Sequence, residues 1–263
     1  MPPAKKRTRR YDSAKTRAAV LAQFAHVREA VEALTAEQLD GPTRLGEWTV
    51  RDLAAHIAWT VDDVTQLLAA PERPGPERLA LLDWPFRTAG AAERIDAHTR
   101  NVDASDLPGL YARVAADYER ALEDASDERL VVLSFGVMTL ADFLVTRTVE
   151  LVVHTDDLVA ATGAEVPYDR QALAACTRLL ADALAAKAPG GAVEVRIPPY
   201  AVVQCVEGPR HTRGTPPNVV ETDPLTWIRL ATGRAEWAAE REEARVGASG
   251  ERADLEDLLP LMG

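Results

Sequence analysis

Residues 139–161, drawn as a helix, are apolar around nearly the whole circumference, so this segment belongs in the interior of a helical fold. Successive residues advance by about 100° around a helix. At that angle Arg147, Glu150 and His154 fall within the same arc as the leucines and the phenylalanine of the segment. A buried charge costs on the order of several kcal/mol unless it is paired or bound to a metal. The segment therefore predicts a buried helix whose ionisable residues have a compensating partner.

Three other segments carry the apolar stripe of a helix that packs in a bundle. They are residues 13–34, a stretch that opens at Thr49 and ends before the proline-rich residues 71–76, and residues 107–125. Thr49 has an aspartate three residues later, which is the pattern of a helix-opening capping box. Four long helices joined by loops predict an antiparallel four-helix bundle.

The pattern changes after residue 163, where short apolar runs and prolines alternate with helical stretches. The predicted strands are residues 192–197, 201–206 and 245–248, and the predicted helices are residues 171–186, 225–232 and 255–261. The fold class is therefore multidomain, with an all-α N-terminal bundle and a C-terminal α+β domain. We divide the chain into a disordered basic leader (residues 1–12), the bundle (13–163) and the α+β domain (164–263).

Composition excludes several classes of function. The chain has no run of about 18 uncharged apolar residues and no apolar core behind its basic start, so we expect neither a membrane span nor a cleavable signal. Two isolated cysteines, Cys176 and Cys205, make no disulfide framework and favour a cytoplasmic location. The net charge is −11 although the first ten residues are basic, so nucleic acid is not an expected partner.

The spacing of Glu150 and His154 suits two ligands of one metal ion, because residues four apart project from the same side of a helix. His56 lies beside the apolar seam of the second helix and can turn toward a neighbouring helix. Two imidazoles and one carboxylate leave coordination positions open, as in catalytic and not in structural metal sites. Asp157 is a candidate acceptor that fixes the imidazole tautomer of His154.

A purely structural interpretation of the same residues remains open. His154 could hydrogen-bond Glu150 or Asp157, Arg147 could neutralise Glu150, and His56 could simply pack. The sequence has no Gly-x-Ser-x-Gly elbow and no phosphate-binding loop to suggest another chemistry.

Two blocks of sequence resemble a known family. Residues 46–56 and residues 147–158 are similar, in order and on the expected helices, to the mycothiol-dependent maleylpyruvate isomerase family of DinB-like proteins. The resemblance implies a DinB-like bundle that binds a divalent metal, most often zinc, through His56, Glu150 and His154. It also implies that the metal binds the thiol of mycothiol, which then attacks a small electrophilic substrate.

Residues 222–234 and 247–255 resemble the end of a sterol-carrier-protein-like domain. The isomerase family also implies a catalytic arginine from the second domain, for which Arg234 is the candidate, beside Arg147 on the fourth helix. Two functions follow as hypotheses. The first is a metal- and mycothiol-dependent isomerase or thiol transferase, with a small molecule and a low-molecular-weight thiol as its partners. The alternative is a non-catalytic carrier of a lipid or another apolar ligand, which a closed apolar tunnel in the C-terminal domain would favour.

Overall fold

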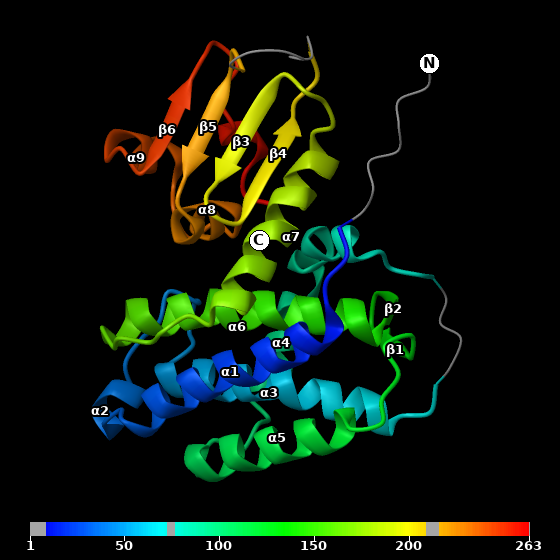
Figure 1. Cartoon of the computed structure of the whole chain (residues 1–263). Coiled ribbons are helices and arrows are strands. Elements are labelled where there is room, and N and C mark those ends of the chain that lie inside the picture. Colours follow the sequence, from blue (N-terminus) through cyan, green and yellow to red (C-terminus); the bar gives the residue numbers. More distant parts are fainter. Residues whose placement is uncertain (1–8, 73–76, 209–215, 263) are drawn as a thin grey trace.

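A computed structural model describes residues 9–72, 77–208 and 216–262, and its N-terminal part is a bundle of four long helices (Figure 1). The four are α1 (Ser13–Glu32), α3 (Val50–Ala69), α5 (Leu107–Leu122) and α6 (Leu140–Thr162). α6 packs against both α1 and α3, and α5 packs against the same two helices. The predicted four-helix bundle is confirmed.

Local sequence explains where the two functional helices begin and end. Thr49 accepts a hydrogen bond from the backbone N–H of Asp52, whose side chain accepts one from the N–H of Thr49, so α3 opens with the predicted capping box. Thr139 caps α6, and Gly163 ends it in the left-handed conformation (φ 69°) that favours glycine. These caps fix both helices independently of any ligand.

Residues 1–8 of the predicted leader lie outside the described residues. The described residues of that segment contact the rest of the chain: Arg9 pairs with Asp182 at 2.8 Å, Tyr11 packs against the core and Asp12 caps α1. Folded structure therefore starts before residue 13.

Several short elements between the long helices were not predicted. They are α2 (Ala36–Leu39), the 3₁₀ helices η1 (Leu81–Arg87) and η2 (Ala89–Ala91), α4 (Ala92–Thr99), and a hairpin of β1 (Leu130–Leu133) and β2 (Gly136–Thr139). Each is too short to show a helical stripe or a clear alternation. The hairpin leads directly into α6 and so lies at the N-terminal end of that helix.

The C-terminal part is a four-stranded sheet in the order β4-β3-β5-β6 with helices beside it. Its elements are α7 (Arg170–Lys187), β3 (Val193–Ile197), β4 (Ala201–Cys205), β5 (Val219–Thr222), α8 (Pro224–Ala231), α9 (Trp237–Glu242), β6 (Val246–Ser249) and η3 (Glu256–Leu258). β3 and β5 are parallel and the other neighbours antiparallel. The predicted α+β class is confirmed.

The prediction of a helix over residues 255–261 is wrong, because only the single turn η3 forms there. Pro260 disfavours helical geometry in the residue before it and donates no hydrogen bond. β5 and α9, of four and six residues, were not predicted.

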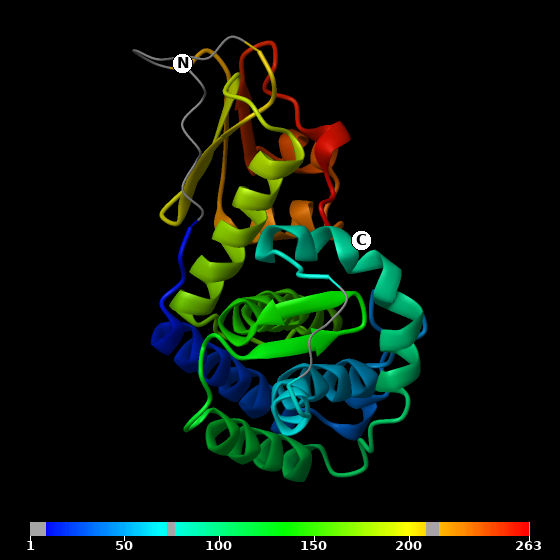
Figure 2. The ribbon, with the colours of Figure 1, turned by 90° about the vertical axis from the view of Figure 1, so that its right-hand side faces the viewer.

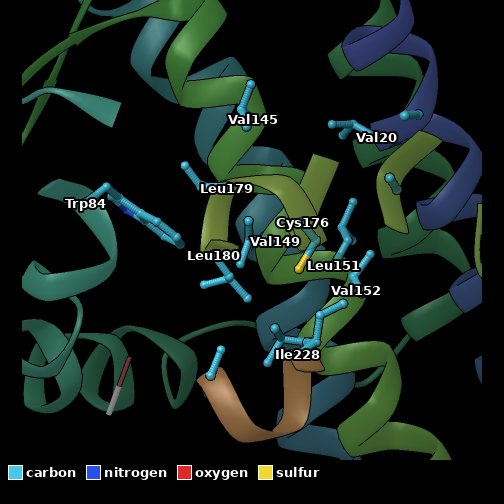
Figure 3. Packing of buried hydrophobic residues seen from close by; sticks show 14 of the residues in the cluster. Val20, Trp84, Val145, Val149, Leu151, Val152, Cys176, Leu179, Leu180 and Ile228 are labelled. Carbon is cyan, nitrogen blue, oxygen red and sulfur yellow. The ribbon is translucent and has the colours of Figure 1, made fainter. Parts of the chain in front are cut away.

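Helix α7 joins the two parts of the molecule. It packs against α1, α6 and η1 of the helical part, and against β4 and α8 of the sheet part; Figure 2 shows it passing from one to the other. Leu179 and Leu180 of α7 lie near Val149 of α6 and Ile228 of α8 (Figure 3). All four side chains are fully or almost fully buried. One continuous apolar core thus runs from the bundle into the C-terminal part, and α7 packs against both α6 and α8.

Candidate metal centre

His56, Glu150 and His154 come from the neighbouring helices α3 and α6. His56 Nε2 lies 3.2 Å from His154 Nε2 and 3.9 Å from Glu150 Oε2. His154 Nε2 lies 3.2 Å from Glu150 Oε2. One possible ligand atom from each residue thus falls within 4.8 Å of those of the other two. The structure brings together the three side chains that the sequence pattern selected.

The far side of each imidazole has a hydrogen-bond partner. His154 Nδ1 lies 2.8 Å from Asp157 Oδ2, and His56 Nδ1 lies 3.3 Å from Thr99 Oγ1. A carboxylate accepts hydrogen bonds only, so it holds a proton on Nδ1 of His154 and leaves Nε2 to face the centre. Metal-binding histidines usually have a partner of this kind.

The two imidazoles differ in their affinity for a second proton. Burial lowers the pKa of His56 to about 4, so this ring is neutral at physiological pH. Burial also opposes the charged form of His154, but hydrogen bonds with Asp157 and Glu150 outweigh it and raise the pKa of His154. For Glu150 burial is again outweighed, and the close contact with His154, together with the nearby His56 and Arg147, holds its pKa well below the ordinary value of 4.5.

These residues fit a divalent metal. When the Nδ1 atoms carry the protons, two Nε2 lone pairs and one carboxylate converge on the same small volume, and such groups repel each other unless a cation or a proton lies between them. Nitrogen and oxygen ligands of this type suit zinc and other divalent transition metals. A proton on Nε2 of His154 and a metal ion therefore compete for one position.

Beside the centre, three arginines surround two consecutive aspartates of α6. Asp157 is fully buried and accepts hydrogen bonds from Arg234 at 2.8 and 2.9 Å and from Arg44 at 2.5 Å. Asp156 pairs with Arg229 and Arg44, both at 2.6 Å. Arg229 and Arg234 belong to α8 and the loop after it, so the C-terminal part of the chain directly holds the aspartate that orients His154. This arrangement keeps the pKa of Asp157 far below its usual range, despite burial, through its bonds with His154 and Arg234.

Asp157 and Arg234 were predicted from the sequence, whereas Arg44, Arg229 and Asp156 were not. Asp156 and Asp157 are adjacent acidic residues in a mostly apolar helix, which indicates that cationic side chains from other segments must pair with them. Nothing in the local sequence said which arginines would do so.

Arg147 lies on the other side of Glu150 and is buried. Its guanidinium packs over the Phe143 ring at 4.4 Å, and its Nη2 lies 3.9 Å from Glu150 Oε1. That distance is too long for a hydrogen bond. The structure thus places Arg147 near the centre without a close carboxylate partner among the described residues.

Two cavities meet at His56 and Glu150. The larger, of about 480 Å³, lies between the bundle and the C-terminal part and reaches Arg234 and Met262. The smaller, of about 200 Å³, lies beside Arg147, between α3 and α6 on one side and η1, α4 and the β1–β2 hairpin on the other. His56 and Glu150 line both cavities, so a ligand could approach the centre from either side.

The structure does not support Cys176 as an alternative catalytic nucleophile. Cys176 is fully buried, and burial raises the pKa of its thiol far above the usual range, which makes it a poor nucleophile. Among the described residues, every helix is too short or too polar to cross a lipid bilayer.

Removal of a bound metal should leave the chain folded, because α3 and α6 have their own caps and a shared apolar core. We expect the far-ultraviolet circular dichroism of chelator-treated protein to stay largely helical, with only a lowered melting temperature, as ligand loss predicts. Collapse of the helical signal on chelation would instead identify the centre as a structural metal site.

Comparisons with known proteins agree with this fold. A family model described as the mycothiol maleylpyruvate isomerase N-terminal domain matches residues 20–159, and one described as a bacterial SCP ortholog matches residues 169–261. Crystal structures of the mycothiol-dependent maleylpyruvate isomerase and of a histidine-to-alanine mutant of it share the fold. Their TM-scores are 0.60 and 0.61, each at 15% identity over 91% of this chain and 93% of the other.

A search of curated proteins finds no match. The isomerase-domain model nevertheless spans more than half of the chain and includes the whole of the candidate centre. The chain therefore belongs to the mycothiol maleylpyruvate isomerase N-terminal domain family and carries a C-terminal part like the bacterial SCP orthologs.

Proposed function

We propose that this protein is a metal- and mycothiol-dependent isomerase or thiol transferase that acts on a small electrophilic substrate. The observation that carries the proposal is the convergence of His56, Glu150 and His154 on one point between two cavities. The matched family and the solved structures, named for mycothiol-dependent maleylpyruvate isomerase, support the choice of thiol.

His56, Glu150 and His154 would hold the metal, most suitably zinc. Bound there, a divalent ion would lower the pKa of a thiol so that the nucleophilic thiolate prevails at neutral pH. Asp157 holds the proton on Nδ1 of His154 and so keeps Nε2 directed at the centre. The buried walls around His56 limit access of bulk water to the reacting atoms.

The interdomain cavity is the better place for the body of a polar thiol. Its wall includes charged and polar side chains, among them Glu47, Asp96 and Arg100, beside the apolar Val149 and Val153. It is also the larger of the two spaces that reach the centre.

Arg234 was expected to be catalytic, and the geometry favours a positioning role. Its Nε and Nη2 bind Asp157, and its Nη1 donates to the carbonyl of Thr232 at 2.8 Å. Its donors are thus directed at the protein, and its effect on the centre passes through Asp157 to His154.

The alternative function, an apolar-ligand carrier, has less support. A cavity of about 390 Å³ beside β3 and β4 is lined partly by Arg196 and Glu221, which lie 3.8 Å apart. Such a lining is not that of a closed apolar tunnel.

The deciding experiment uses cobalt in place of zinc as a spectroscopic probe. Addition of mycothiol should produce sulfur-to-metal charge-transfer absorption, and the apparent affinity should rise with pH as the thiol loses its proton. The variant Glu150→Gln should lose the signal, whereas His98→Ala, which removes an exposed histidine outside the three, should keep it. An unchanged spectrum at saturating mycothiol, together with tight binding of a fatty ligand, would favour the carrier.

A further inference from the structure

We infer that the smaller cavity, between α3, α6 and the β1–β2 hairpin, binds a small molecule with one carboxylate and an apolar body, and that Arg147 is the residue that recognises the carboxylate. The inference deepens the proposed function by naming the class of substrate. Its physical basis, however, is the state of Arg147 and the walls around it, and neither depends on a bound metal or thiol.

Arg147 is a buried guanidinium without a hydrogen-bonded anion among the described residues. The Arg147 side chain is only 7% exposed. Its Nε donates to Thr146 Oγ1 at 3.2 Å and its Nη1 to the Thr60 carbonyl at 3.4 Å, both neutral acceptors. Its nearest acidic contact among the described residues is Glu150 Oε1, at 3.9 Å from Nη2. A desolvated charge in this state gains from any anion that reaches it.

The second observation is that Glu150 is committed elsewhere. Its Oε2 lies 3.2 Å from His154 Nε2 and 3.9 Å from His56 Nε2, so the carboxylate belongs to the three-residue centre. The negative charge of Glu150 interacts with His56, His154 and any ion that they hold. Arg147 can therefore pair with the carboxylate of a ligand. The planar fork of a guanidinium matches a carboxylate with two parallel hydrogen bonds.

The cavity around Arg147 fits a small apolar body. Its volume is about 200 Å³, and its walls include Trp59, Trp84, Phe135 and Phe143. Trp84 and Phe143 are 2% or less exposed, so these walls are fixed parts of the core. The tip of the β1–β2 hairpin, with the exposed Ser134, forms part of the rim.

Two other charged residues line the same cavity. Asp63 lines it, and burial raises the pKa of this carboxyl, although attraction to Arg147 opposes the shift. No hydrogen bond or ion pair joins Asp63 to Arg147 among the described residues, so the guanidinium donors are not held by this carboxyl. Arg94 is exposed and stands at the margin, where solvent screens its charge. Arg147 is therefore the buried cation of this cavity and the natural anchor for one carboxylate.

Benzoate, which carries one carboxylate on one ring, is the probe, with uncharged benzamide as its control. Binding is measured by calorimetry on the full chain after chelation, so that no metal offers the carboxylate another partner. We expect benzoate to bind at least about tenfold more tightly than benzamide, and Arg147→Met to abolish that preference, as loss of a hydrogen-bonded charge predicts. Arg100→Met, which removes an arginine from the larger cavity, should leave benzoate binding unchanged.

A second variant keeps the test decisive if Arg147→Met fails to fold. Ser134→Trp adds a large side chain at the exposed rim and should block benzoate without disturbing the core. Equal binding of benzoate and benzamide to the unaltered chain, or benzoate binding that survives both variants, would overturn the inference. If benzoate binds but mycothiol does not change the cobalt spectrum, the thiol-dependent function is refuted and the carboxylate site stands. If mycothiol changes the spectrum but benzoate does not bind, only the carboxylate site is refuted.

Discussion

The variant His154→Ala should purify almost free of metal, whereas the unaltered chain should hold close to one divalent ion. His154 would supply one of the three ligand atoms that the described residues bring together at the centre, and its Nε2 lies 3.2 Å from both His56 Nε2 and Glu150 Oε2. Mutation of groups that merely orient a ligand already weakens metal binding by roughly 10- to 100-fold. Loss of a ligand itself should exceed that, and elemental analysis after dialysis measures it.

The exposed histidine variant His98→Ala is the matched control and should retain its metal. Residual binding by His56 and Glu150 is compatible with the assignment, but full retention in His154→Ala would refute it. The pH dependence gives an independent check. Hydrogen bonds with Asp157 and Glu150 raise the pKa of His154, so acidification adds a proton to Nε2 and displaces the metal. Metal content should therefore fall on acidification and recover on return to neutral pH.

The bundle and its three central residues could be predicted because their signals are local. The capping residue Thr49 and the apolar stripe after it determine α3, and the four-residue spacing of Glu150 and His154 is visible on one helix. The nearly continuous apolar surface of α6 also showed that these charges had to be compensated. Only the approach of His56 depended on how two helices pack.

The arginines around Asp156 and Asp157 could not be predicted, because they depend on tertiary docking. Arg44 lies in the loop before α3, and Arg229 lies on α8, more than seventy residues from Asp156 in the sequence. Their convergence requires α7 to pack on α6 and α8 to pack on α7. The cavity beside Arg147 could not be predicted either. Part of its rim is the hairpin that β1 and β2 form, and these strands are too short to show a clear sequence pattern.

The convergence of arginines on Asp157 predicts that Asp157→Asn lowers both the stability of the fold and the affinity of the protein for metal. Asp157 is fully buried and bonded to His154, Arg44 and Arg234. Removal of one partner from a buried ion pair typically costs about 3–5 kcal/mol. The two arginines are 30% and 16% exposed, so water compensates part of the loss. We therefore expect a decrease near the lower limit, about 3 kcal/mol in the free energy of unfolding, measured by urea titration of the metal-free protein.

Asp156→Asn separates the two effects, because Asp156 is equally buried and pairs with Arg44 and Arg229 but does not contact His154. Both variants should be less stable at neutral pH, and only Asp157→Asn should also bind metal more weakly, by roughly 10- to 100-fold. The stability difference from the unaltered chain should shrink in acid. The folded-state pKa of Asp157 is depressed, so its contribution is complete above its ordinary pKa of 3.8 and is lost as the pH falls below that value. Equal metal affinity in the two variants would show that Asp157 serves only to hold the C-terminal part against α6, and that the orientation of His154 does not depend on it.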